Sequence, residues 1–180
     1  MGEYYNASNF FKKSYSRVSP KDKEKRALRA FMMGECYRHI NYSQKAVAAY
    51  QNAVRYKYPD SLSLFYLAQQ QLKIGNYKQA EQNFRLYLEK DPANELAHMG
   101  LLSCEMAPQW KANPNLYRVK KEGIFNSRRS DFSPMLVGDE SEQLVISSTR
   151  NDATGDDYSG ITGTSFSDLF LAKKDENGKW

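Results

Sequence analysis

The feature that most constrains this chain is an internal repeat with a period of 34 residues. Apolar or small residues recur at this spacing in the segments 27–60 and 61–94. The aligned pairs are Leu28 and Leu62, Phe31 and Phe65, Met33 and Leu67, Gly34 and Ala68, Ala46 and Ala80, Tyr50 and Phe84, and Val54 and Leu88. Units of this length stack on their neighbours to bury a continuous core, so the fold should be an array of such units.

Each unit should contain two helices joined by a tight turn. In the segment 61–94, apolar residues at helical spacing form two stripes, one on each side of the break at Gly75 and Asn76. The second stripe ends before Pro92. Small residues such as Gly34 would let two antiparallel helices approach closely, and an aromatic residue such as Tyr50 would fill the space beside them.

Two units are too short to bury their own faces, so flanking helices should belong to the same array. Residues 4–16 have helical spacing and are followed by a break at Ser19 and Pro20. Residues 95–106 continue the 34-residue phase up to Pro108, and a short capping helix is expected over 113–123. The sequence therefore predicts a helical domain over 1–125, with a degenerate third repeat at 95–124.

The two cysteines occupy equivalent places in this array. Cys36 and Cys104 are 68 residues apart, which is twice the period. Helices stack about 8–10 Å apart, so residues two repeats apart are too distant for a disulfide. Both should be small buried side chains, and the sequence has no Cys and His cluster that would make a zinc site.

Charge divides the chain into two parts. Up to Ser130 there are 22 Lys and Arg against 11 Asp and Glu, a net charge of +11. From Asp131 onward there are 4 against 10, a net charge of −6, which together with the first part gives the total of +5. This shift predicts a boundary at residues 126–131.

After this boundary the helical spacing stops. Residues 144–148 and 168–174 have the composition of strands, and Asn177 and Gly178 are a pair favoured in hairpin turns. Two or three short strands are not stable alone, so this segment either pairs with the helices or begins a truncated domain. We favour the second interpretation.

The sequence contains little that indicates catalysis, and we expect no catalytic residues, no metal site and no cofactor. His39 and His98 lack HExxH spacing and a neighbouring nucleophile. The glycine-rich residues 160–165 lack the lysine of a phosphate-binding loop. Asp152, Asp156 and Asp157 miss the EF-hand spacing, so a solvated acidic turn is favoured over a calcium site.

A basic run over residues 12–29 carries eight Lys and Arg against Asp22 and Glu24. We interpret it as the solvated face of two amphipathic helices, with a site for an anionic ligand as the alternative. Nucleic-acid binding is not expected, because the aromatic residues follow core spacing and do not interleave with the basic ones. No run of about 18 apolar residues indicates a membrane span, so we expect no direct membrane insertion of this segment.

The repeat resembles the tetratricopeptide family. The residues at its signature positions are Leu67, Ala68, Gly75, Tyr77, Ala80, Phe84 and Pro92 in the second unit, and Gly34, Tyr37, Ala46, Tyr50 and Ala53 in the first. Gln71 departs from the pattern because the family usually has an aromatic there, and Pro59 falls one place late. The resemblance implies an all-α, right-handed α-solenoid whose concave groove is lined by the first helix of each repeat.

This groove is the candidate site, suited to an extended or helical peptide of a partner protein. By the repeat phase its residues are Leu28, Phe31, Glu35, Arg38, His39, Leu62, Phe65, Gln69, Leu72, Lys73, Leu96, Met99, Ser103 and Met106. Phe31 and Glu35 stand where the family's carboxylate-clamp members have Lys and Asn, so recognition of an acidic C-terminal tail is not expected. Alternatively, the N-terminal helix or the second domain covers some of these residues.

Residues 126–180 resemble the incomplete first blade of a TolB-like, WD-type β-propeller. Phe132, Ser133 and Pro134 would lead into the blade, residues 144–150 would form its second strand, and Asp168 would begin the third. Together, the two parts are similar to Bacteroidota envelope lipoproteins that join tetratricopeptide repeats, a propeller and an OmpA-like peptidoglycan-binding domain.

That similarity implies a non-catalytic docking module in the periplasm, associated with the outer membrane, whose partners belong to a type IX secretion assembly. Peptidoglycan would be bound only by a domain outside this sequence. The alternative is a structural arm that packs on its own propeller and positions the wall-binding domain.

Overall fold

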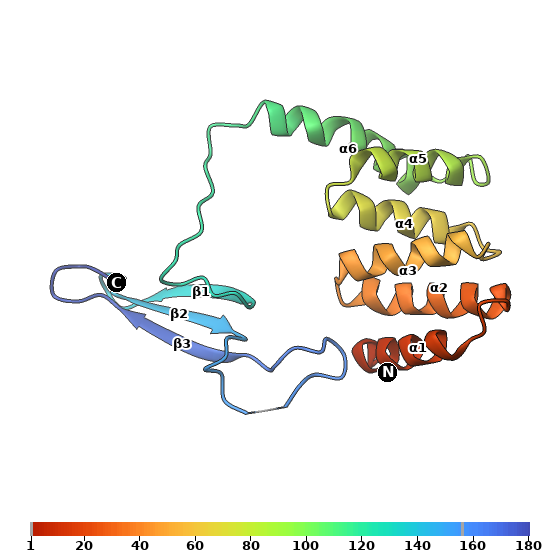
Figure 1. Cartoon of the computed structure of the whole chain (residues 1–180). Coiled ribbons are helices and arrows are strands. Elements are labelled where there is room, and N and C mark those ends of the chain that lie inside the picture. The colour runs from red at the N-terminus through yellow and green to blue at the C-terminus, as the bar shows by residue number, and fades with distance from the viewer. Residues whose placement is uncertain (1, 156) are drawn as a thin grey trace. The chain divides into compact units, whose positions relative to one another are not determined.

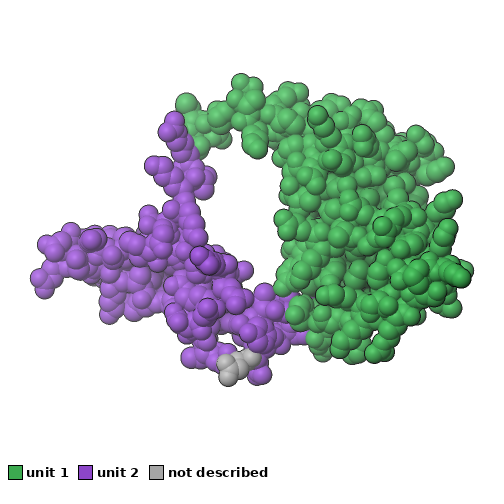
Figure 2. Space-filling model, in the orientation of Figure 1, with its two compact units in different colours: residues 1–117 green, residues 118–180 purple. Residues whose placement is uncertain are grey.

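The computed structural model describes residues 2–155 and 157–180 and divides the chain into two compact units, 1–117 and 118–180 (Figures 1 and 2). The first unit is helical. It contains α1 (Tyr4–Arg17), α2 (Lys23–His39), α3 (Ser43–Arg55), α4 (Leu62–Lys73), α5 (Tyr77–Leu88) and α6 (Glu95–Ala112). The second unit contains a small antiparallel sheet of β1 (Asp131–Val137), β2 (Gln143–Ser148) and β3 (Asp168–Lys173).

The helices of the first unit stack in chain order (Figure 1). Each helix packs on the next one along the chain, and α6 contacts α4 as well as α5. Such neighbour-to-neighbour packing is typical of a helical repeat region. The chain therefore contains a helical repeat region followed by a partial sheet.

The turns between paired helices repeat the same hydrogen bonds 34 residues apart. After α2, the N–H of Tyr42 donates to Tyr37 O at 2.9 Å, and after α4 the N–H of Asn76 donates to Gln71 O at 2.9 Å. The residues just before them, Asn41 and Gly75, both have positive φ, of 58° and 81°. Asn and Gly are the residues that tolerate this left-handed conformation, which closes a helix and permits a sharp turn.

Small residues permit the close helix packing that the sequence predicts. Ala46, Ala68 and Ala80 are fully buried, and the rings of Tyr50 and Phe84 fill the space between helices. A Cβ atom added to Gly34 would lie 2.7 Å from the Tyr50 ring. The predicted role of these positions in close packing is therefore confirmed.

Helix α6 and the segment after it differ from expectation. The helix continues through Pro108 to Ala112, although we expected it to end before that proline. Proline removes one backbone hydrogen bond, the one to the carbonyl four residues earlier, but here the helix continues on both sides of it. Residues 113–125 contain no helix, so the predicted capping helix at 113–123 is wrong. Leu116 and Val119 are fully exposed there, and without a buried face so short a helix is not stable.

The sheet has the order β1-β2-β3, with β2 in the centre. Leu144 pairs with Leu136 on one side and with Ala172 on the other. The β1 register shifts between Phe132 and Met135, where Ser133 has a positive φ and Pro134 offers no N–H for pairing. Both predicted strands are confirmed.

The end of the sheet is held by Asp131. Its Oδ1 accepts hydrogen bonds from the Ser148 hydroxyl at 2.6 Å and from Arg150 at 2.9 Å. Arg150 also donates to the Phe125 carbonyl at 2.9 Å. This contact ties the segment before β1 to the sheet, which explains why the division between the compact units falls earlier than the shift in charge.

Candidate functional site

The fourteen predicted groove residues all lie on the alternate helices α2, α4 and α6, but their exposure differs. The exposed members are Leu28, His39, Lys73, Leu96 and Met99. The half-buried members are Glu35, Arg38, Leu62, Gln69, Leu72, Ser103 and Met106. Phe31 and Phe65 are buried.

The burial of Phe31 and Phe65 corrects the expectation that they face an open groove. Phe31 stacks on the Tyr58 ring, with the ring centroids 4.2 Å apart. Phe65 lies against Phe84 and Tyr87, with centroid distances of 6.0 and 5.1 Å. These two positions lie at the border between groove and core, and aromatic residues of their own repeats cover them.

A polar cluster lies near the C-terminal end of α2. The Arg38 guanidinium donates to both oxygens of Glu35, at 3.2 and 2.7 Å, and Glu35 also accepts a hydrogen bond from the Tyr50 hydroxyl. The guanidinium carbon of Arg38 lies 4.3 Å from the centre of the Tyr66 ring on α4. Arg38 is therefore held in place from two helices.

This cluster changes two pKa values. The hydrogen bond to Glu35 raises the pKa of Arg38, so its positive charge is fixed at any physiological pH. Burial, and after it the hydrogen bond to Glu35, raises the pKa of Tyr50, so its hydroxyl stays protonated. The cluster therefore contains a fixed Arg38–Glu35 ion pair, and neither Arg38 nor Tyr50 loses its proton near neutral pH.

A hollow of about 370 Å³ lies beside this cluster, between α2 and α4. It is lined by Arg38, Gln69, Gln70, Leu72 and Lys73, four of which belong to the predicted groove. The Lys73 ammonium donates to Asn41 Oδ1 at 3.3 Å. The hollow therefore combines two cations, two carboxamides and one aliphatic side chain.

Gln70 is the residue of this hollow that the sequence analysis missed. Its side chain is almost fully buried, and its Oε1 atom accepts no hydrogen bond from any residue that the structure describes. A buried carboxamide without a partner costs free energy, and a ligand N–H would satisfy it if the Gln70 side chain turned into the hollow. The sequence does contain a sign that Gln70 is unusual. Gln70 is in phase with Cys36 and Cys104, so a small apolar residue would be expected at its position.

The two ends of the groove differ in character. At the α2 end, the His39 ring stacks on Tyr4 of α1, with the ring centroids 4.4 Å apart. At the α6 end, Leu96 and Met99 are 61% and 63% exposed. Helix α1 thus contacts the groove at His39, which stays exposed, whereas α6 presents an exposed apolar surface.

No protein-family model matches this chain, and no curated protein matches it.

The two cysteines lie in the core of the helical unit. Both cysteines are free and buried, as predicted, and burial raises the pKa of each thiol, so neither is activated as a nucleophile. In the described part of the chain, no three His, Cys, Asp or Glu side chains are arranged to hold a metal ion. Asp156 of the predicted acidic turn lies outside the described residues. Among the described helices, none is both long and apolar enough to cross a membrane.

Proposed function

We infer that residues 2–117 form a right-handed α-solenoid of the tetratricopeptide type that docks a partner protein along the face made by α2, α4 and α6. The 34-residue recurrence of turn hydrogen bonds, positive-φ positions and small packing residues supports this fold. The partner contributes an extended segment, and this chain performs no catalysis on it.

The observation that carries the proposal is the hollow between α2 and α4. Gln70 Oε1 is buried without a partner, and it accepts a peptide N–H when the Gln70 side chain turns into the hollow. Lys73 and Gln69 offer donors to peptide carbonyl or carboxylate groups, and Leu72 contacts an apolar side chain. Binding of the backbone gives affinity, and these side chains add specificity.

The place of this docking is also a proposal, and it rests on the resemblance to Bacteroidota envelope lipoproteins. It assigns the protein to the periplasm, next to the outer membrane, with a partner in a type IX secretion assembly. The sheet of residues 131–173 then begins a β-propeller that acts as a spacer or second docking face.

Site-specific photo-crosslinking tests the docking proposal. A photoreactive residue replaces Gln69, which is half-buried in the hollow, and the matched control replaces Gln82, which is exposed on α5. In cells that make the whole protein, we expect one partner to be captured from Gln69 and not from Gln82. Equal capture from both positions would contradict docking in the groove.

A second candidate is a structural arm whose solenoid packs only on other parts of its own chain. The burial of Phe31 and Phe65 favours it, because the largest aromatic residues of the predicted groove are already used in the core. In that case, the Gln69 probe crosslinks only within the same polypeptide.

A further inference from the structure

The basic run of residues 12–29 separates into groups with different surroundings. Arg26 serves the fold, because its guanidinium donates to Val18 O at 2.9 Å and to the Tyr56 hydroxyl at 3.3 Å. Lys25 forms an ion pair with Asp22 at 2.8 Å. Three other cations of the run, Lys13, Arg17 and Arg29, line a common hollow between α1 and α2.

This hollow has a volume of about 650 Å³, and its lining contains no Asp or Glu. Within the described residues, Lys13, Arg17 and Arg29 form no ion pair. Three positive charges around one concavity repel one another, and an anion seated among them removes that repulsion. The charge therefore specifies an anionic ligand.

Arg29 adds a second, independent observation. Its Nε atom is buried and finds no acceptor among the described residues. A buried guanidinium nitrogen without an acceptor has lost its hydration and gained no hydrogen bond in return. A carboxylate is the acceptor whose two oxygens best match the paired N–H donors of a guanidinium. A carboxylate in this hollow would compensate Arg29 once the side chain turns its Nε–H toward the ligand.

The apolar part of the lining further restricts the kind of ligand that fits the hollow. Phe10, Phe11 and Val18 line the same hollow, and Phe10 is 73% exposed. An apolar group of the ligand would cover these side chains while its carboxylates meet the three cations. The concavity has the volume of a typical ligand site, which suits inserted side chains better than a flat membrane surface.

We propose that the hollow between α1 and α2 binds an acidic peptide segment of a partner protein, in which carboxylates flank an aromatic or aliphatic side chain. This site is separate from the α2, α4 and α6 face and stands without the function proposed for that face. It assigns a binding role to α1, and it selects the anionic-ligand interpretation for part of the basic run.

Fluorescence anisotropy of the whole chain with a fluorescein-labelled peptide Glu-Asp-Phe-Asp-Glu tests the proposal. Saturable binding is expected, with loss of binding for the amide peptide Gln-Asn-Phe-Asn-Gln. The double substitution Lys13→Ala, Arg17→Ala should weaken binding about tenfold or more, which corresponds to about 1.4 kcal/mol. Both side chains are exposed, so the variant should fold.

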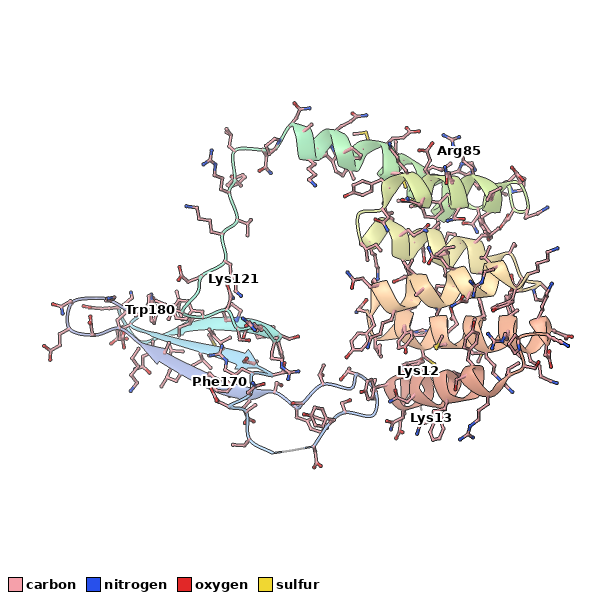
Figure 3. The ribbon with its side chains drawn as sticks, viewed as in Figure 1. Lys12, Lys13, Arg85, Lys121, Phe170 and Trp180 are labelled. Atoms are coloured by element: carbon pink, nitrogen blue, oxygen red, sulfur yellow. The ribbon has the colours of Figure 1, made fainter. Side chains whose placement is uncertain are left out.

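Lys12→Ala is the matched control, because Lys12 is next to Lys13 on α1 (Figure 3) but is not among the residues that line the hollow. We expect it to change the affinity less than about twofold, because its exposed charge makes no direct contact with a peptide in the hollow and is screened by solvent and salt. A Lys73→Glu variant should also leave binding unchanged, which separates this site from the groove.

Four results would overturn the proposal. Equal weakening by Lys12→Ala would mean diffuse attraction to a basic surface, and equal binding of the amide peptide would mean that the carboxylates are not recognised. Weakening by Lys73→Glu would place the peptide in the groove. Binding to phosphatidylglycerol vesicles without binding to the peptide would mean that the ligand is a membrane.

Discussion

At the scale of single residues, Gln70 is notable because it is buried and its Oε1 atom has no hydrogen-bond partner among the described residues. The 34-residue phase places it with Cys36 and Cys104, which are buried small residues. Its neighbour Gln71 is also buried, but it accepts a hydrogen bond from Asn83 at 2.7 Å. The chain thus offers two adjacent buried carboxamides, one with and one without a partner.

Replacing Gln70 with Met should raise the free energy of unfolding by about 1 kcal/mol, because it removes a buried acceptor without a partner and keeps the side-chain length. Gln71→Met should lower the free energy of unfolding by about 1 kcal/mol, because Asn83 loses the acceptor of its hydrogen bond. Urea unfolding measures both changes, on condition that the two variants unfold with equal m values. A Gln70→Met variant less stable than the original chain would show that the Gln70 amide is satisfied in the folded state.

Phe31 and Phe65 show what a sequence pattern leaves undecided at this scale. Repeat phase correctly placed both on the first helix of each unit. It could not indicate how deeply they are buried, because that depends on the rings of Tyr58 and Tyr87, which lie at other positions of the repeat.

At the scale of helices and turns, the sequence predicted most of the structure. Hydrophobic spacing and the break at Gly75 placed the paired helices, because a short period of apolar residues is a local signal. Pro108 was misleading, since a proline removes one backbone hydrogen bond but does not end every helix that contains it. The expected cap at 113–123 failed because a helix start at Pro114 is not enough without an apolar face to bury.

Close packing at Gly34 should make this position intolerant of a methyl group. The added Cβ would lie 2.7 Å from the ring of Tyr50, which is fully buried and cannot move aside. We therefore expect Gly34→Ala to lower the free energy of unfolding by about 1–3 kcal/mol.

Thermal unfolding followed by circular dichroism checks this. Gly123→Ala is the control, since nothing lies within 4 Å of its added Cβ, and it should unfold at nearly the original temperature. Equal effects of the two substitutions would mean that α2 and α3 are not in close contact.

Asp131 should make the sheet sensitive to acid. The hydrogen bond from Ser148, followed by one from the Ser127 N–H, holds the pKa of Asp131 well below its ordinary value of 3.8. A lowered folded-state pKa stabilises the fold above about pH 4, and this contribution is lost as the pH falls further toward the lowered pKa. Asp131→Asn should therefore reduce the dependence of unfolding on pH below 4.

Trp180 reports on this unit, because its ring lies 5.3 Å from that of Phe125. Its fluorescence can be followed during urea unfolding at several acidic pH values, with exposed Trp110 replaced by Phe to remove the second signal. An unchanged acid profile in Asp131→Asn would contradict the assigned role of this carboxylate.

At the scale of the whole molecule, the two units differ in structure as well as in charge. The basic part forms a helical repeat region, whereas the acidic part forms a three-stranded sheet. The sequence predicted this division because charge and hydrophobic period change together near residue 130. The sequence could not predict which hydrogen bonds join the connecting segment to the sheet. One example is the bond that Arg150 donates to the Phe125 carbonyl.

The most direct test of the account compares crosslinking from Gln69 in the original sequence with that in two variants of the same hollow. Gln70→Met removes the carboxamide without a partner, and Lys73→Glu reverses an exposed charge. Docking in the groove predicts that each substitution lowers capture of the same partner about tenfold or more while the protein stays folded. Undiminished capture in both variants would contradict the claim that this face of α2 and α4 binds the partner.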